Sequence, residues 1–173
     1  MKQEFSIFIV NPVTGDFETP ESWAKVVDPT GAELIALKRH GEQGGLFISK
    51  NLIKGGLGVL KVDFDGAVKL ASGFKPTTVY PADRTVEGVF RLPNRRECLD
   101  MYDARFQGLD DALKLIGGDP LTGCWIWTGD EDPDPEYNSS DAFFFYGGGG
   151  GVLNLNLKYR TYGVRPVSAF LPF

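Results

Sequence analysis

This sequence of 173 residues contains little of what several common functional classes require. Two cysteines, Cys98 and Cys124, are too few for the disulfide framework of a small secreted domain. The single histidine, His40, excludes a zinc site with several histidine ligands. No apolar run approaches the length of a membrane-spanning helix, so we expect no membrane insertion.

Positive charge is also scarce. The net charge is −5, whereas nucleic-acid binding needs clustered Lys and Arg that release counterions. The densest basic cluster, Arg91, Arg95 and Arg96, is diluted by Glu97 and Asp100. We therefore expect no nucleic-acid partner. The opening letters MKQEFSIFIVNP predict a strand rather than a signal peptide.

The two cysteines leave one alternative open. They could pair with each other, but sequence spacing alone cannot decide this. Apolar neighbours such as Met101 and Trp125 favour buried thiols instead.

What the sequence does have is glycine, proline and aromatic residues, which favour a turn-rich protein with many strands. Short apolar runs predict strands at residues 5–10, 33–37 and 46–48. Alternation over residues 59–64, then Asp65-Gly66, predicts a hairpin that continues into residues 67–70.

Two helices are predicted in the middle of the chain. Asn94 and Glu97 form a capping-box pattern ahead of Cys98 and Met101, which are spaced as in a helix. A second helix begins near residues 109–110, turns Ala112, Leu113 and Ile116 inward, and ends at Gly117-Gly118.

The last third of the chain predicts strands at residues 142–146, 152–157 and 163–170. Trp125, Trp127, Phe143 and Phe145 recur at period two and are predicted to face the core. Four tyrosines in polar or glycine-rich surroundings are predicted to be exposed: Tyr137, Tyr146, Tyr159 and Tyr162.

Alternation makes two further predictions. Asn154, Asn156 and Lys158 should share one face, opposite the leucines at 153, 155 and 157. Arg165 lies in the predicted terminal strand and is interpreted as a scaffold residue that needs carboxylate or carbonyl partners.

Patterns typical of ion or nucleotide sites have simpler interpretations. Acidic residues 130–136 offer oxygen ligands for calcium, but Pro133 and Pro135 extend the backbone and favour a solvated loop. The five glycines at 147–151 lack the Lys-Ser/Thr of a phosphate loop and predict a hairpin tip. We predict no metal and no cofactor.

Catalytic patterns are equally weak. His40 has no triad that the sequence spacing supports, and no serine lies in G-x-S-x-G. Asp63 and Asp65 could form a glycosidase pair, but paired acids at a turn more often face solvent.

Four sequence blocks occur in a specific order: RLPNRREC from Arg91, LDDALKLIGGDPLTGCWIWTGDE from Leu109, DAFFFY, and LKYRTYGVRPVSAF from Leu157. Over residues 88–170 they resemble the bacterial and phage family of C-type-lectin-fold domains that contain RLPT, Y-W-S-S-T-E and a terminal V-R-P-V. The resemblance implies an α+β, C-type-lectin-like fold with two helices packed on small antiparallel sheets.

Members of that family are similar to the variable proteins of diversity-generating retroelements. In these proteins, mutated Asn codons cannot yield Glu, Lys, Gln, Met or Trp, and residues 137–157 contain none of those types. The resemblance implies a binding surface of variable residues on a constant scaffold.

Departures limit what the resemblance implies. The family's Tyr-Trp-Ser-Ser-Thr-Glu is here Ile126-Trp127-Thr128-Gly129-Asp130-Glu131, and the calcium motifs of animal lectins are absent. Formylglycine-generating enzymes have a similar fold, but their catalytic cysteine pair has no counterpart at Cys98 and Cys124. We therefore predict a protein that is not an enzyme.

The expected organisation is a β-rich region at 1–85, interpreted as an attachment or oligomerisation module, followed by a lectin-like binding domain at 86–173. The expected function is adhesion or host recognition of a protein or glycan receptor, on a phage particle or at a cell surface, with a homo-oligomer compatible with this role. The alternatives are a structural component of a phage particle or fimbria, and an enzyme related to the formylglycine-generating enzymes. The predicted ligand-binding residues are Tyr137, Asn138, Ser139, Asp141, Tyr146, Asn154, Asn156, Tyr159, Arg160 and Tyr162.

Overall fold

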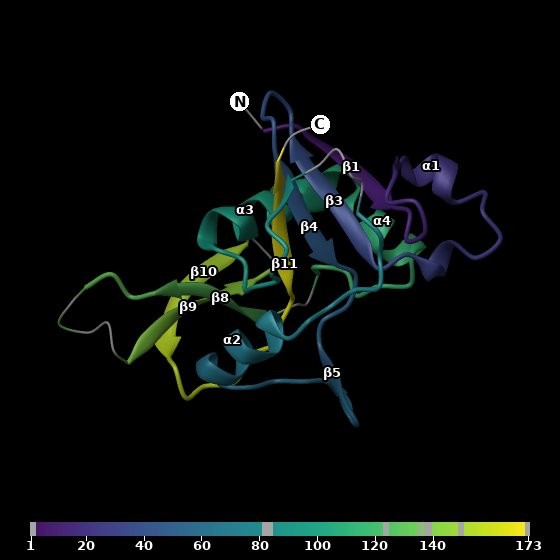
Figure 1. Cartoon of the computed structure of the whole chain (residues 1–173). Helices are drawn as coiled ribbons and strands as arrows, with labels where there is room; N and C mark the ends of the chain where they lie inside the picture. The colour runs from purple at the N-terminus through teal and green to yellow at the C-terminus, as the bar shows by residue number, and fades with distance from the viewer. Residues whose placement is uncertain are drawn as a thin grey trace.

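A computed structural model describes residues 3–80, 85–122, 125–134, 136, 140–148 and 151–171. It has a mixed α+β architecture built on antiparallel strands, as predicted (Figure 1). The principal helices are α2 (Phe64–Ser72), α3 (Arg95–Ala104) and α4 (Asp110–Leu115), with short helical segments α1 (Pro20–Trp23), η1 (Pro29–Gly31) and η2 (Arg105–Leu109). Among the described residues, the helices are all too short or too polar to cross a membrane.

A six-stranded antiparallel sheet forms the larger half of the molecule, in the order β2-β1-β3-β4-β11-β7. Its strands are β1 (Phe5–Val10), β2 (Phe17–Glu18), β3 (Leu34–Arg39), β4 (Gly45–Ser49), β7 (Thr85–Val86) and β11 (Val167–Leu171). The C-terminal strand β11 lies between β4 and β7, so residues on both sides of position 85 share one sheet. The attachment role expected for residues 1–85 stays a prediction.

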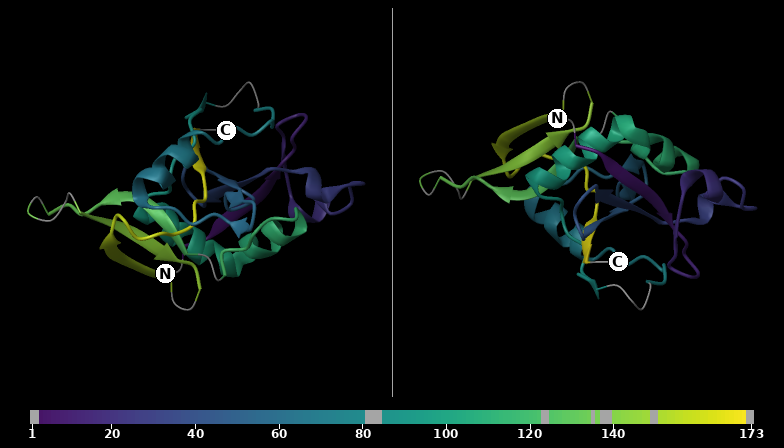
Figure 2. Two further views of the ribbon diagram at one scale, coloured as in Figure 1. Left: turned by 90° about the horizontal axis from the view of Figure 1, so that it is seen from below. Right: turned by 90° about the horizontal axis from the view of Figure 1, so that it is seen from above.

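Both faces of this sheet are covered, which explains its nearly continuous apolar runs. Ile35 and Leu37 of β3 pack into a core cluster with Met101 of α3. Leu34 and Ala36 point the other way and pack with an aromatic cluster around Phe47. Figure 2 shows the helices α3 and α4 along one side of the sheet.

The two central helices form as predicted. Asn94 Oδ1 accepts from the Glu97 amide at 2.8 Å, and Glu97 Oε1 accepts from the Asn94 amide at 2.8 Å, which completes the capping box. Gly117 has φ of 75°, the left-handed conformation expected of a glycine after a helix end. Cys98 is buried as expected, whereas Cys124 lies outside the described residues, so their pairing stays open.

The predicted hairpin at residues 59–70 is wrong, because residues 64–72 form the helix α2. Asp63 caps it, its carboxylate accepting from the Gly66 amide at 2.8 Å. Phe64, Ala67 and Ala71 are buried at helical spacing. Between β4 and α2, β5 (Lys54–Gly55) pairs with β6 (Gly58–Val59) over two residues, and Val62 bridges to Tyr162.

A second sheet has the order β10-β9-β8, from β8 (Trp125–Glu131), β9 (Asp141–Tyr146) and β10 (Val152–Leu157). On one face, Ile126, Phe145 and Leu153 join the core beneath α3 and α4. The opposite face packs partly on α2, where the Trp127 ring meets Phe64 edge-on at 5.6 Å.

Arg165 is buried and binds backbone carbonyls, as predicted. Its guanidinium donates to the carbonyls of Ser49 at 2.8 Å and Asp119 at 2.6 Å, and more weakly to that of Lys50 at 3.2 Å. These bonds join the segment after β4 to the segment after α4. Arg165 therefore holds the two sheets and the helices in one arrangement.

Candidate ligand-binding surface

The β8–β10 sheet presents one partly open face. Its register places Trp125 opposite Tyr146, and Val152 of β10 on the other side of Tyr146. Asn154 lies beside Phe144 in the same way. We call this face the aromatic surface and define it by these residues: Trp125, Phe144, Tyr146, Val152, Asn154, Asn156 and Tyr162.

Its rings form a continuous stack. Trp125 lies 4.2 Å from Tyr146 between ring centroids, with the planes at 19°. Phe144 lies 5.6 Å from Trp125 and 4.6 Å from Tyr162, again nearly parallel. Offset stacking of this kind orients the rings before any ligand arrives, which reduces the entropy lost on binding.

On this face of the β8–β10 sheet, side chains are buried near α2 and become more exposed toward the opposite end. Near α2, Trp127 is fully buried and donates its indole N–H to the Val62 carbonyl at 2.9 Å. At the opposite end Trp125 is 44% exposed and Val152 is 43% exposed. The indole of Trp125 therefore keeps apolar area in water that a ligand can cover.

Amide groups lie on the same face, beside the rings. Asn156 donates from Nδ2 to the Tyr162 hydroxyl at 2.7 Å, which fixes both side chains. Asn154 is exposed, and its Oδ1 accepts from the Leu155 amide at 2.8 Å. The described residues provide no bond to Asn154 Nδ2, which can donate to a ligand.

The structure separates the predicted site residues into two groups. Tyr146, Asn154, Asn156 and Tyr162 lie together on the aromatic surface. Asp141, Tyr159 and Arg160 lie at the other end of the sheet, where Asp141 pairs with Leu157 and the chain then turns. Tyr159 is 65% exposed there, with the Arg160 guanidinium 5.3 Å from its ring centroid. Tyr137, Asn138 and Ser139 lie outside the described residues.

Trp125 is the main residue that sequence reasoning misplaced. The prediction that Trp125, Trp127, Phe143 and Phe145 all face the core is wrong in part. Trp127 and Phe145 are buried, but Trp125 is partly exposed, and Phe143 is half-buried with the Arg95 guanidinium 4.2 Å from its ring centroid. Period-two alternation gives the face of a strand but not how far along that face the neighbouring helix extends.

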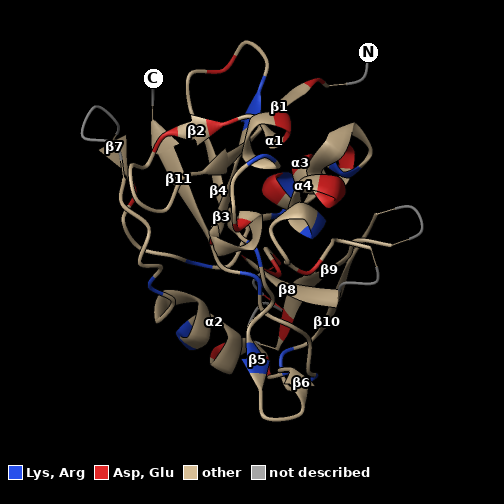
Figure 3. Cartoon of the chain, turned by 90° about the vertical axis from the view of Figure 1, so that its right-hand side faces the viewer, with Lys and Arg blue, Asp and Glu red and all other residues tan. Residues whose placement is uncertain are grey.

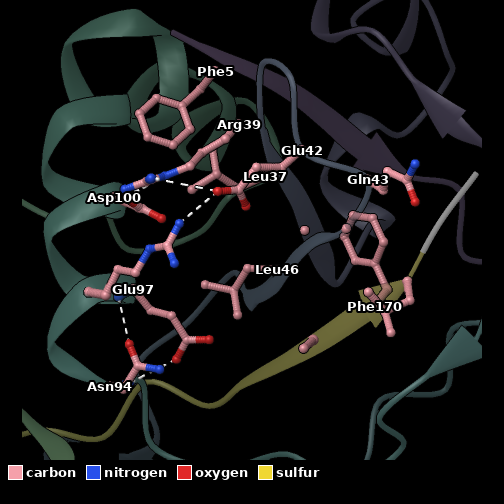
Figure 4. Close-up of a pocket in the computed structure, with 15 residues that line it drawn as sticks. Phe5, Leu37, Arg39, Glu42, Gln43, Leu46, Asn94, Glu97, Asp100 and Phe170 are labelled. Atoms are coloured by element: carbon pink, nitrogen blue, oxygen red, sulfur yellow. Dashed lines mark hydrogen bonds and ion pairs between the residues drawn. The ribbon is translucent and has the colours of Figure 1, made fainter. Parts of the chain in front are cut away.

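A separate pocket of about 500 Å³ lies between α3 and the six-stranded sheet (Figure 4). Its floor is apolar, with Phe5, Leu37, Leu46 and Phe170. The charged groups at its edge pair with one another: Arg39 Nε donates to Asp100 at 3.0 Å, and Arg96 donates to Glu42 at 2.6 Å. This mutual pairing leaves little unbalanced charge to attract an ionic ligand.

Two opposing effects act on the pKa of Asp100 in this pocket. Burial raises the pKa of Asp100 and outweighs the opposing effect of its bond to Arg39. The same bond raises the pKa of Arg39 against its own burial. At neutral pH the pair is best described as a structural contact between α3 and β3.

Ser6, His40 and Glu4 form a cluster that sequence spacing did not reveal. His40 Nε2 lies 3.0 Å from Ser6 Oγ, and His40 Nδ1 lies 3.1 Å from a Glu4 oxygen. These are the distances of a nucleophile, a base and an orienting acid. The His40 and Glu4 side chains, however, are 53% and 76% exposed, whereas such catalysis depends on a site that excludes water. We interpret the cluster as a polar contact between neighbouring strands.

In the described part of the acidic loop, Asp130 and Glu131 bond other elements: Asp130 Oδ2 accepts from the Arg95 amide at 2.8 Å, and Glu131 pairs with Lys158 at 3.2 Å. The next two carboxylates bond the backbone of the loop itself. Asp132 Oδ1 accepts from the Asp134 amide, and Asp134 Oδ1 accepts from the Glu136 amide, both at 3.0 Å. These Asx turns are typical of a solvated loop.

The chain matches no family model and no curated protein. The resemblance of residues 88–170 to C-type-lectin-fold domains therefore stays a prediction.

Proposed function

We propose that this chain is a non-enzymatic binding protein that recognises a protein or glycan receptor through the aromatic surface. The observation that carries the proposal is the stacked, partly exposed group of Trp125, Tyr146 and Tyr162 with Asn154 beside it. Rigid aromatic rings supply contact area at low entropy cost, and amides supply direction.

The scaffold beneath this surface supports a binding role. Ile126, Phe145 and Leu153 fix the inner face of the β8–β10 sheet in the core, so the outer face can vary without loss of the fold. Two consecutive helices packed on small antiparallel sheets also agree with a C-type-lectin-like domain, which we propose as the specific fold.

The ligand should be tested on glycan and protein arrays with the labelled full chain. Each hit is then measured by titration against the wild type, Trp125→Ala and Asn154→Ala. We expect Trp125→Ala to weaken binding at least about tenfold, as for a central aromatic hot spot, and Asn154→Ala to weaken it less.

Phe106→Ala is the matched control, because Phe106 is an aromatic residue 61% exposed outside the aromatic surface. It should bind as the wild type does. Hits that bind Trp125→Ala and the wild type equally would place recognition elsewhere and contradict the proposal.

The variability of the surface is a separate hypothesis, and DNA flanking the gene tests it. A near-copy of the codons for residues 130–165 beside a reverse transcriptase gene would establish diversification, and its mismatched adenines would identify the contact residues. Absence of both would leave a binder of fixed specificity.

A further inference from the structure

The outer edge of β1 has backbone groups that face away from the sheet. The His40 amide donates to the Glu4 carbonyl at 2.9 Å, and β1 pairs with β3 in the same antiparallel register. Glu4, Ser6 and Phe8 therefore direct their peptide groups toward β3, whereas Phe5 and Ile7 direct theirs outward.

Both ends of this edge are occupied. At one end, Ile9 pairs with Glu18 of β2, after which the chain turns into α1. At the other end, Gln107 Oε1 accepts from the Phe5 amide at 3.0 Å and its Nε2 donates to the Gln3 carbonyl at 2.7 Å. The Gln107 amide thus bonds β1 as a residue of a neighbouring strand would.

A gap remains between these ends. No hydrogen bond within the described residues reaches the Phe5 carbonyl, or the amide and carbonyl of Ile7 on the outward side. A hollow of about 610 Å³ lies along this edge, bounded by the start of α1 on one side and by η2 and α4 on the other. Figure 2 (right) shows β1 at the edge of the sheet between these elements.

The hollow is apolar and acidic. Ile7, Ala112 and Leu115 supply apolar surface, while Glu21 and Asp111 supply carboxylates, and the lining contains no Lys, Arg or His. Both carboxylate residues are exposed. Figure 3 shows acidic residues in the part of the molecule where α1, α3 and α4 lie near β1.

We propose that this hollow binds an extended basic segment of a partner protein, which adds a short strand to the open edge of β1. The Phe5 carbonyl and the amide and carbonyl of Ile7 pair with about three residues of the segment, and a flanking Lys or Arg meets Glu21 or Asp111. A second copy of this chain fits less well, because two edges recessed between helices cannot approach to the strand spacing of about 4.8 Å.

The probe is the peptide acetyl-Lys-Val-Thr-Val-Lys-amide, titrated into the ¹⁵N-labelled full chain and followed by NMR. We expect the Ile7 and Phe5 amide signals to shift and hydrogen exchange at Ile7 to slow severalfold. The same peptide N-methylated at its three internal residues should produce neither change, since it cannot form the ladder. Equal shifts with the methylated peptide, or no shift of residues 5–8 at millimolar peptide, would overturn the proposal.

Charge variants locate the site without disturbing the core. Glu21→Lys with Asp111→Lys should weaken peptide binding about tenfold at low salt. Asp134→Lys with Glu136→Lys makes the same change in net charge at exposed positions in the acidic loop and should leave binding nearly unchanged. Equal weakening in both pairs would show attraction to overall charge and reject the hollow as the site.

Dilution of the chain without peptide tests self-association. The Ile7 amide signal should not depend on protein concentration. A concentration-dependent shift at Ile7 would make a second copy the occupant and overturn the assignment to a basic partner segment.

Discussion

The two sheets of this protein are built from similar apolar and aromatic strands, yet they differ in how they are covered. The six-stranded sheet is buried on both faces, with Met101 on the helix side and Phe47 on the aromatic side. The β8–β10 sheet is buried on one face, while α2 covers only the Trp127 end of the other. Similar strand sequences therefore provide stability in one region and a surface available for binding in the other.

The largest loss of stability should come from a substitution of Phe47, which is fully buried among Phe17, Tyr80 and Phe170. We expect Phe47→Ala to lower the free energy of unfolding by about 4 kcal/mol, because it removes ring contacts and leaves a cavity. Urea denaturation followed by circular dichroism measures this loss. A loss below about 1 kcal/mol would contradict the conclusion that the six-stranded sheet is more deeply buried than the β8–β10 sheet.

Arg165 tests whether the two regions depend on each other. Arg165→Met removes the donor to the carbonyls of Ser49, Lys50 and Asp119, and we expect a loss of about 3 kcal/mol. Arg165→Lys should recover part of it, since an ammonium group can reach fewer of these carbonyls. Denaturation of the three forms gives the comparison, and wild-type stability in Arg165→Met would refute the scaffold role.

Trp125 should behave as a binding residue. Trp125→Ala loses stacking on Tyr146 and the covered part of an indole that is 44% exposed, so the cost in unfolding free energy should be about 1.5 kcal/mol, well below that of Phe47→Ala. The same denaturation assay checks this, alongside the array hits. A cost similar to that of Phe47→Ala would assign the aromatic surface to the core instead.

A smaller effect is expected from Glu33, whose carboxylate accepts from the hydroxyls of Thr77 and Thr78. Burial raises the pKa of Glu33, but its hydrogen bonds to Thr78 and Thr77 together outweigh burial and hold the pKa below the ordinary 4.5. The carboxylate therefore stabilises the fold above about pH 4.5, and this contribution disappears as the pH falls through the lowered pKa.

Thermal unfolding between pH 3 and pH 7 measures this dependence. As the pH falls below 4.5, the melting temperature of Glu33→Gln should decrease less than that of the wild type, because the variant has no carboxylate to protonate at this position. Parallel pH profiles for the two proteins would show that Glu33 does not contribute. The change should be smaller than that of Trp125→Ala, because Glu33 is only partly buried and solvent screens its charge.

Local patterns predicted much of the fold. The capping box at Asn94, the glycine stop at Gly117 and the strands β1, β3 and β4 are where the sequence placed them to within two residues, whereas the short strand β2 was not predicted. The prediction failed at residues 64–72, where Asp65-Gly66 was interpreted as a turn. Asp63 is instead a helix cap, and the spacing of Phe64, Ala67 and Ala71 was the helical signal that this interpretation missed.

The aromatic surface was predicted less completely. Asn154 and Asn156 share a face with Tyr146 because alternation within β10 and its pairing with β9 are local properties. Asp141, Tyr159 and Arg160 were grouped with them by closeness in sequence, but they lie at the other end of the sheet. Trp125 was missed because its exposure depends on where α2 ends.

Neighbouring residues and side-chain chemistry were enough to predict the starts of α3 and α4, the longer strands and the need of Arg165 for carbonyl partners. Which strand faces stay open could not be read from local patterns. Coverage depends on contacts between segments far apart in the chain, such as α2 on β8 and β11 between β4 and β7. The same is true of the free edge of β1, which exists because β2 ends after two residues and Gln107 bonds only one end of the gap.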